Sequence, residues 1–310
     1  MSRTSRHAAS PAPAAAPVEE PWTILRLMLR SADYLREKGV PSARLDAEHL
    51  LAHALGVGRL ELYLQHERPL LSAELDRFRP LLRRRAGREP LQYILGRQAF
   101  RELDLEVGPA VLVPRPETEV LVDEVLAWMR AEQRVDVAAL DVGTGSGAIA
   151  LSLAREGPCR TVVATDVSEA AVRVAERNRA TAGLDDAVEL RVGWYFEPVG
   201  AAERFDVIVS NPPYVAETEA GSLEPEVREW EPAGALLAGP DGLAALRVVV
   251  GGAAAHLRPG GLLALEVGAG QAGAVARMLE ERGAYEDVSV RRDLAGKERI
   301  VLGRGTNADT

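Results

Sequence analysis

Residues 140–150 read LDVGTGSGAIA, and this stretch decides the fold expected for the whole chain. It closes an apolar run, VAALDV (137–142), and opens a second run, SGAIALSLARE (146–156), with helical spacing. Glycines let a backbone turn sharply and approach a ligand without an intervening Cβ, and the helix N-terminus behind them offers free N–H groups. The stretch therefore predicts a strand, a ligand-binding loop and a helix. The loop residues are Gly143, Thr144, Gly145, Ser146 and Gly147.

An acidic residue follows at the end of the next predicted strand, TVVATDV (161–167). Asp166 stands 23 residues after Gly143, where a carboxylate can accept hydrogen bonds from both hydroxyls of a ribose. The spacing of Gly143, Gly145 and Ala148 also satisfies the dinucleotide pattern G-x-G-x-x-G/A. The loop and the acid thus predict a nucleoside cofactor, and leave both a dinucleotide and S-adenosylmethionine open.

The chain beyond Pro116 alternates between strand-like and helical runs. Alternation of this kind predicts an α/β fold, a parallel sheet with helices on both faces. The further strands are AVELRV (187–192), FDVIVS (205–210), GLLALEVG (261–268) and a hairpin-like end at 285–303. We expect a Rossmann-like domain over residues 116–304.

The strand FDVIVS ends at an unusual turn, Asn211-Pro212-Pro213-Tyr214. Its carboxyl end is expected to open onto the same crevice as the glycine loop. Asn211 offers a side-chain carbonyl and Pro212 a backbone carbonyl, while a residue before proline is held extended. Tyr214 adds a flat aromatic surface. Two acceptors beside an aromatic ring suit a planar –NH2 group conjugated to a π system.

Such a nitrogen is a weak nucleophile because its lone pair is delocalised. Fixing both of its hydrogens turns the lone pair toward an electrophile, and positioning alone is worth several kcal/mol. The methyl group of a sulfonium is a strong electrophile, whereas hydride transfer has no use for this turn. The turn therefore favours S-adenosylmethionine over NAD. A rigid turn without chemistry is the alternative, since Asn-Pro and Pro-Pro are common turn formers.

The part of the chain before Pro116 divides into three. Residues 1–21 are rich in Ala, Pro and Ser and are expected to be a disordered tail, although a targeting peptide is an alternative. Residues 22–89 have helical spacing broken by Gly and Pro, which predicts four or five short helices. Residues 90–115 are expected to form a hairpin linker from RELDLEVG (101–108) and AVLVP (110–114). Residues 305–310 are expected to be a short tail.

A run of arginines, Arg83, Arg84, Arg85 and Arg88, closes the helical region. It is interpreted as a solvated helix face, with a contact for an acidic partner as the alternative. Charge is uneven along the chain. Residues 22–115 hold 16 Lys/Arg and 12 Asp/Glu, a net +4, whereas residues 116–310 hold 19 and 32, a net −13. The acidic half argues against binding duplex nucleic acid, which requires neutralisation of phosphates.

Cysteine, histidine and hydropathy narrow the class of protein further. Cys159 is the only cysteine, so no intrachain disulfide forms, which fits a reducing, cytoplasmic compartment. The five histidines and this cysteine form no pair of the C-x-x-C type, and we expect no metal. No apolar run reaches the roughly 18 residues of a membrane span, and we expect no membrane association.

Several stretches together resemble class I S-adenosylmethionine-dependent methyltransferases that act on an amide nitrogen. They are REPLQYILGRQAF, LVPRPETEVLVDEVL, DVGTGSGAIA, TDVS, SNPPYV, EPAGALLAGPDGL, LEVGAGQ and DLAGKERIVLG, and the resemblance runs from about Trp22 to Gly303. Within that class the chain is similar to the protein-(glutamine-N5) methyltransferases, which modify the GGQ motif of class 1 peptide chain release factors.

The resemblance implies a seven-stranded methyltransferase domain with a small N-terminal helical bundle joined by a β-hairpin. It places S-adenosylmethionine on residues 143–147 and Asp166, leaving S-adenosylhomocysteine as product, and Asn211 beside the cofactor as well. Asn211 and the Pro212 carbonyl would accept the glutamine amide hydrogens. Pro213 and Tyr214 would complete the substrate site, with Tyr214 packed on the amide.

One segment departs from the family pattern. Many members carry an acid before an aromatic residue near the adenine, but this chain reads RVGWYFEP (191–198). We expect Trp194 to contact the adenine, with Tyr195 or Phe196 as alternatives. Trp194 could instead anchor the domain core.

Three other functions remain to be weighed. A related family methylates a glutamine of a ribosomal protein, but usually reads PRSPI where this chain has PRPET (114–118). An N6-adenine methyltransferase shares Asn-Pro-Pro-Tyr and would need a basic groove. A binding module that has lost catalysis is the third. We expect a monomer whose helical domain docks the release factor.

Overall fold

The computed structural model describes residues 21–306, and its chain divides into two compact units at Ala86/Gly87. The tail expected at 1–21 lies outside the described residues except for Pro21, and so does 307–310 of the tail expected at the other end. Gly305 is instead the last residue of a strand. Within residues 21–306, no helix combines the length and apolar character that crossing a membrane requires.

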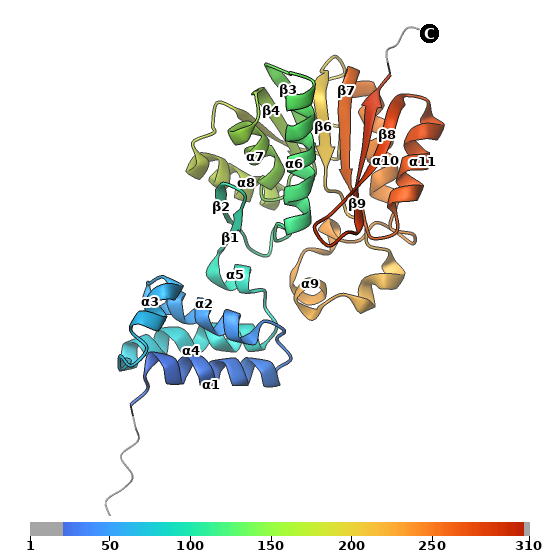
Figure 1. Ribbon diagram of the computed structural model, residues 1–310. Helices are drawn as coiled ribbons and strands as arrows, with labels where there is room; N and C mark the ends of the chain where they lie inside the picture. The colour runs from blue at the N-terminus through green and yellow to red at the C-terminus, as the bar shows by residue number, and fades with distance from the viewer. Residues whose placement is uncertain (1–20, 307–310) are drawn as a thin grey trace, which may run out of the picture. The chain divides into compact units, whose positions relative to one another are not determined.

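The first unit is built from helices, as the spacing predicts (Figure 1). They are α1 (Ile24–Glu37), α2 (Ala43–Leu55), α3 (Arg59–Leu64) and α4 (Ser72–Ala86). Thr23 caps α1 by accepting from the Arg26 amide, and Gly56 ends α2 in the left-handed conformation that glycine favours. Leu35, Leu50 and Leu62 are fully buried between the helices. Burial of these apolar faces holds the short helices together.

The arginine run does not form one solvated face. Arg83 and Arg84 are exposed, but Arg85 is buried and its Nε lies 2.7 Å from Oδ2 of Asp46 on α2. Arg88, in the second unit, pairs with Glu226. The solvated-face interpretation is therefore wrong for Arg85, because a partner distant in sequence compensates its charge.

The second unit contains the predicted α/β domain (Figure 1). Its elements are α5 (Leu91–Leu95), β1 (Arg97–Phe100), β2 (Leu103–Glu106), α6 (Pro116–Ala131), β3 (Val137–Val142), α7 (Ala148–Glu156), β4 (Cys159–Asp166), α8 (Glu169–Ala182), β5 (Val188–Val192), β6 (Phe205–Ser210), α9 (Pro225–Trp230), α10 (Ala244–His256), β7 (Leu257–Glu266), α11 (Ala272–Arg282), β8 (Tyr285–Arg292) and β9 (Glu298–Gly305). Short 3-10 turns occupy Glu217–Ser222 and Ala233–Ala235.

The large sheet has seven strands in the order β5-β4-β3-β6-β7-β9-β8. The first five are parallel, and β9 and β8 add an antiparallel edge. The chain runs outward from β3 to β5 and then returns to place β6 on the other side of β3. Strand order therefore reverses between β3 and β6, and ligands bind at such a point outside the carboxyl ends of the strands.

Both faces of the sheet are covered, which explains why its central strands read as continuous apolar runs. Ala139 and Val207 face a core shared with α6 and α7, whereas Leu140 and Ile208 face a core shared with α10 and α11. Every residue of β3 and β6 is buried. The two strands that present the site are thus fixed from both sides.

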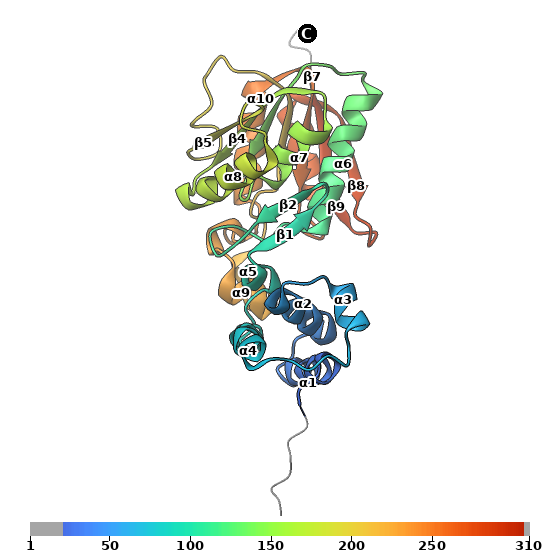
Figure 2. The same cartoon turned by 90° about the vertical axis from the view of Figure 1, so that its left-hand side faces the viewer.

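The hairpin linker exists, but the predicted pairing is wrong. β1 pairs with β2 through a turn at Arg101, whose φ is 51°, and AVLVP (110–114) is not a strand. Pro109 and Pro114 remove two backbone donors around that segment, and the Val111 amide donates to the Gly108 carbonyl in a turn instead of to a strand. The hairpin lies beside α8, where Asn178 donates to the Glu106 carbonyl and accepts from its amide (Figure 2).

Candidate active site

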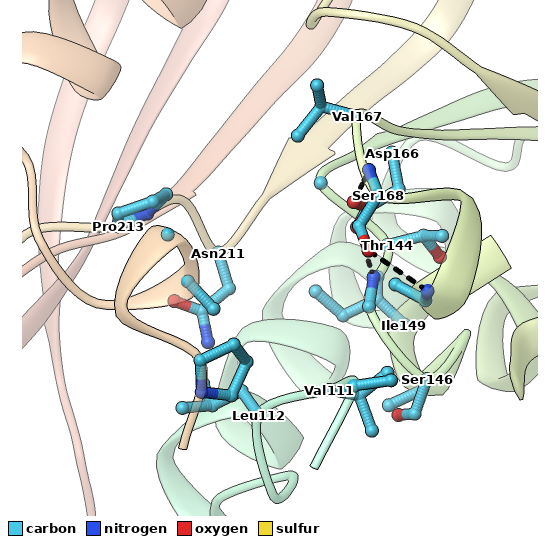
Figure 3. A pocket seen from close by; sticks show the side chains of 18 of the residues that line it. Val111, Leu112, Thr144, Ser146, Ile149, Asp166, Val167, Ser168, Asn211 and Pro213 are labelled. Atoms are coloured by element: carbon cyan, nitrogen blue, oxygen red, sulfur yellow. Dashed lines mark hydrogen bonds between the residues drawn. The ribbon is translucent and has the colours of Figure 1, made fainter. Parts of the chain in front are cut away.

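A cavity of about 390 Å³ lies at the carboxyl ends of β3, β4 and β6 (Figure 3). Its size falls in the range of roughly 300–1,000 Å³ typical of small-molecule sites. The loop after β3, the end of β4 and the turn after β6 all line it, and Figure 3 shows Asn211 on the opposite side from Asp166 and Ser168. The structure therefore brings together the two motifs that the sequence singled out.

The glycine loop follows a path that other residues adopt with strain. Gly143, Gly145 and Gly147 have φ of 80°, 57° and 86°, all in the left-handed region. Asp141 holds the loop from beneath, because its Oδ2 accepts from Thr144 Oγ1 at 2.7 Å and from the Ala150 amide at 3.1 Å. Burial raises the pKa of Asp141 to about 7. Sequence reasoning quoted this residue but gave it no role.

Asp166 is already engaged by the protein on both oxygens. Oδ2 accepts from the Gly145 amide and Oδ1 from the Ser168 amide, each at 2.9 Å. A carboxylate has about four lone-pair positions, so Asp166 can also accept from a ligand such as a ribose hydroxyl. Burial raises the pKa of Asp166, and the backbone hydrogen bonds from Ser168 and Gly145 oppose that rise. The residues present therefore fit a nucleoside at this wall.

The opposite wall is held by side chains. Asn211 Nδ2 donates to Thr118 Oγ1 at 3.0 Å, and Thr118 donates to Glu266 Oε2 at 2.7 Å. The other oxygen of Glu266 accepts from the Tyr214 hydroxyl at 3.3 Å. These residues come from α6, the end of β7 and the turn after β6. Sequence reasoning missed Thr118 and Glu266, although both stand in stretches that carried the resemblance.

Burial dominates the electrostatics of this wall. It raises the pKa of Glu266 to about 7, and the nearby charge of Glu117 adds to the rise. The hydrogen bonds from Thr118 and Tyr214 and the charge of Arg299 act in the opposite direction. Burial also raises the pKa of Tyr214, and the charge of Glu266 acts in the same direction.

The predicted site residues divide between the cavity and its support. Those that line the cavity are Gly143, Thr144, Gly145, Ser146, Asp166, Trp194, Asn211 and Pro213. Gly147 instead precedes α7 as its N-cap, and Pro212 is buried. Tyr214 packs against the core beneath α10 and α11, so its ring is not part of the cavity lining.

The aromatic residues of 194–196 lie in different places. Trp194 and Tyr195 both line the cavity, and Trp194 is 58% exposed. Phe196 stacks on His256 at a centroid distance of 5.5 Å and packs in the core. Phe196 is therefore no longer a candidate for adenine contact, and Trp194 is not a core anchor.

Two segments missed by sequence reasoning form the rim of the cavity. One is 110–114 and the other is the 3-10 turn with Pro232, Gly234 and Ala235. Arg115 joins them, because its Nη2 lies 2.7 and 2.8 Å from the two oxygens of Glu231. Glu231 is buried, and burial raises its pKa. Arg115 thus has a structural partner, although sequence reasoning assigned it no role.

The doubly wound sheet, its glycine loop and the Asn-Pro-Pro-Tyr turn define a methyltransferase domain. Residues 118–224 match the family model described as the methyltransferase small domain, and residues 27–96 match the PrmC N-terminal domain. A methyltransferase structure from Pyrococcus furiosus shares the fold, with a TM-score of 0.50 and 23% identity, covering 67% of this chain and 92% of that one.

Curated relatives cover nearly the full chain. A release factor glutamine methyltransferase from Geobacter sulfurreducens is 46% identical over 92% of this chain and 98% of its own length. One from Rhodopirellula baltica is 40% identical over 91% and 96%. The chain belongs to the release factor glutamine methyltransferase family and is an enzyme.

Proposed function

We propose that this enzyme transfers a methyl group from S-adenosylmethionine to the side-chain amide nitrogen of the GGQ glutamine in class 1 peptide chain release factors. One observation carries the proposal. Asn211 donates a hydrogen bond from Nδ2 to Thr118, and no described residue donates to its Oδ1. A free amide oxygen beside a nucleoside-sized cavity is the acceptor that a substrate –NH2 group requires.

The residues that would hold the cofactor are those of the glycine loop with Asp166 and Trp194. Asp166 would accept from the ribose hydroxyls, and Trp194 would cover the adenine. When bound, S-adenosylmethionine supplies a methyl group on a sulfonium, and the electrons of the broken C–S bond stay on sulfur. No base has to act first, because the nitrogen loses its proton after it has gained the methyl group.

The residues that would hold the target amide are those of the turn after β6. The Asn211 side chain and the Pro212 carbonyl would each accept one amide hydrogen, and Pro213 would bound the site. We place Tyr214 behind the turn, where its hydroxyl donates to Glu266, rather than over the substrate. Holding both hydrogens directs the nitrogen lone pair toward the methyl group, which is a gain from orientation.

The helical unit is proposed to dock the protein substrate, and the enzyme is proposed to act as a monomer in the cytoplasm without a metal. The acidic balance of residues 116–310 disfavours a duplex nucleic-acid substrate. Deletion of unit 1 should raise the KM for the release factor more than that for the cofactor. An unchanged protein KM would reject the docking role.

The test is transfer of a labelled methyl group to a purified release factor beside a GGA variant. Label on the GGQ protein alone supports the proposal. Label on neither protein, with the cofactor still bound in calorimetry, would redirect the search to ribosomal proteins and then to nucleic acid. Failure to bind the cofactor would point to a binding module.

A further inference from the structure

A network of hydrogen-bonded side chains runs from the cavity into the protein. It begins at Asn211, passes through Thr118 and ends at Glu266, with bonds of 3.0 and 2.7 Å. β6 itself is held in the sheet by backbone pairing with β3 and β7. Glu266 is 1% exposed, and Thr118 is 4% exposed. This network is therefore shielded from water, which would otherwise compete for its hydrogen bonds.

We propose that Thr118 and Glu266 are positioning residues that fix which end of the Asn211 amide faces the substrate. This inference rests on the proposed function, since it assumes that Asn211 accepts from the target amide. An Asn side chain has an acceptor at one end and a donor at the other, and a half-turn exchanges them. If the Asn211 Nδ2 faced the substrate –NH2 group, two donors would face each other and no hydrogen bond could form.

The single proton of the Thr118 hydroxyl decides the orientation of the Asn211 amide. An ionised carboxylate only accepts, so the hydroxyl proton of Thr118 must go to Glu266. The Thr118 oxygen then has only acceptor capacity left for Asn211, and Nδ2 is the amide atom that can use it. Oδ1 is consequently left for the substrate. The second oxygen of Glu266 accepts from Tyr214, so the same carboxylate also fixes the far end of the turn.

The elements α6, β7 and β6 position the three side chains of this network. Thr118 lies in the first turn of α6, which Pro116 begins. Glu266 ends β7, whose Leu265 pairs with Ser210 immediately before Asn211. The charged groups that influence Glu266 are Glu117 on α6 and Arg299 on β9. A side chain supported in this way can select one amide orientation.

The first test compares Thr118→Val with Thr118→Ser. Valine keeps the shape but removes the hydroxyl, so kcat for methyl transfer to the release factor should fall by about tenfold or more, because misorientation costs rate. Cofactor affinity and KM should stay within about twofold, as for an interaction used mainly in the transition state. Serine keeps the hydroxyl and should restore most of the rate. Equal loss in both variants, or wild-type rate in valine, would overturn the proposal.

The second test separates positioning from stability. Glu266→Gln has one acceptor oxygen for two donors, so kcat should fall. Asp206→Asn is a matched control, because Asp206 is also buried and accepts from the Ala138 amide and Arg258 at the other end of β6. Both variants should lower the melting temperature, but only Glu266→Gln should lower kcat. A parallel loss of kcat in the control would show that stability alone is responsible.

A double variant completes the argument. In an Asn211→Ala background, Thr118→Val should cause no further loss of rate, because there is no amide left to orient. An additive loss would place Thr118 in another role. Wild-type transfer to the release factor is measured first, so failure of the proposed function shows in the wild type and failure of this inference shows only in the variants.

Discussion

The two walls of the cavity are built in different ways. The cofactor wall uses residues 143–168, and its bonds run mainly from backbone amides to carboxylates, as between Gly145 and Asp166. The substrate wall joins Asn211 to Thr118 and Glu266 through side chains, and the last two are 148 residues apart in sequence. A wall made by backbone depends on local conformation, whereas a wall made by side chains depends on the whole fold.

The difference predicts how each wall fails. Loss of one side chain on the substrate wall removes an acceptor or changes its orientation and leaves the cofactor loop intact. Loss of Asp166 removes the acceptor of the Gly145 and Ser168 amides as well as of the ligand. Variants on the two walls should therefore separate kcat from cofactor affinity.

The largest expected effect is that of Asn211→Ala. It removes the proposed acceptor for the target amide, and misplacement of a reacting group costs about 10²-fold in kcat or more. Cofactor affinity should be unchanged, because no cofactor-wall residue bonds to Asn211. Single-turnover methyl transfer and calorimetry measure the two quantities. Equal loss of cofactor binding would show that Asn211 has been misplaced.

Asp166→Ala should act mainly on cofactor affinity rather than on kcat. It removes charge-assisted hydrogen bonds to the ribose, which are worth roughly 1.5–3 kcal/mol, so cofactor affinity should fall about ten- to hundredfold. Transfer at saturating cofactor should fall much less. Asp166→Asn is the matched control for charge, since it keeps the shape and one acceptor. A variant that binds the cofactor normally would remove Asp166 from the site.

The same contrast explains what could be predicted from sequence. Gly143 and Asp166 were found because their spacing in one strand–loop–helix–strand unit is itself the signal. Thr118 and Glu266 could not be joined, because nothing local to either residue specifies a partner on another element. The hairpin shows the same limit, since the alternation around 103–106 was detected but its partner was taken as 110–114 instead of 97–100.

The pH dependence of transfer tests the substrate wall. Glu266 must be ionised to accept from both Thr118 and Tyr214, and its pKa is raised to about 7 by burial. The rate should therefore increase roughly tenfold between about pH 6 and pH 8, as for one group titrating in that window. Glu266→Gln should flatten this rise, and Asp206→Asn should retain it. A rise that persists in Glu266→Gln would assign it to another group.

Stability should change with pH in the opposite direction. Glu266 and Asp141 both have folded-state pKa values of about 7, above their usual 4.5 and 3.8. Each folded-state carboxyl binds protons more tightly than the unfolded one, so its contribution to stability is present at low pH and is lost as pH rises through about 7. Denaturant unfolding should give a lower free energy at pH 8 than at pH 6. An increase over this interval would contradict the raised pKa values of these two buried carboxyl groups.

The smallest loss of cofactor affinity is expected for substitution of Trp194. This variant tests how much an aromatic side chain contributes to cofactor binding on that wall. Trp194 lines the cavity while 58% exposed, so it can cover a ligand but loses little packing when removed. Trp194→Ala should lower cofactor affinity by about 0.5–1.5 kcal/mol, the usual value of an aromatic contact, and Trp194→Phe should restore most of it. Phe196→Leu is the control, because Phe196 stacks on His256 in the core and should affect stability only. Unchanged affinity in Trp194→Ala would leave Tyr195 as the aromatic residue beside the adenine.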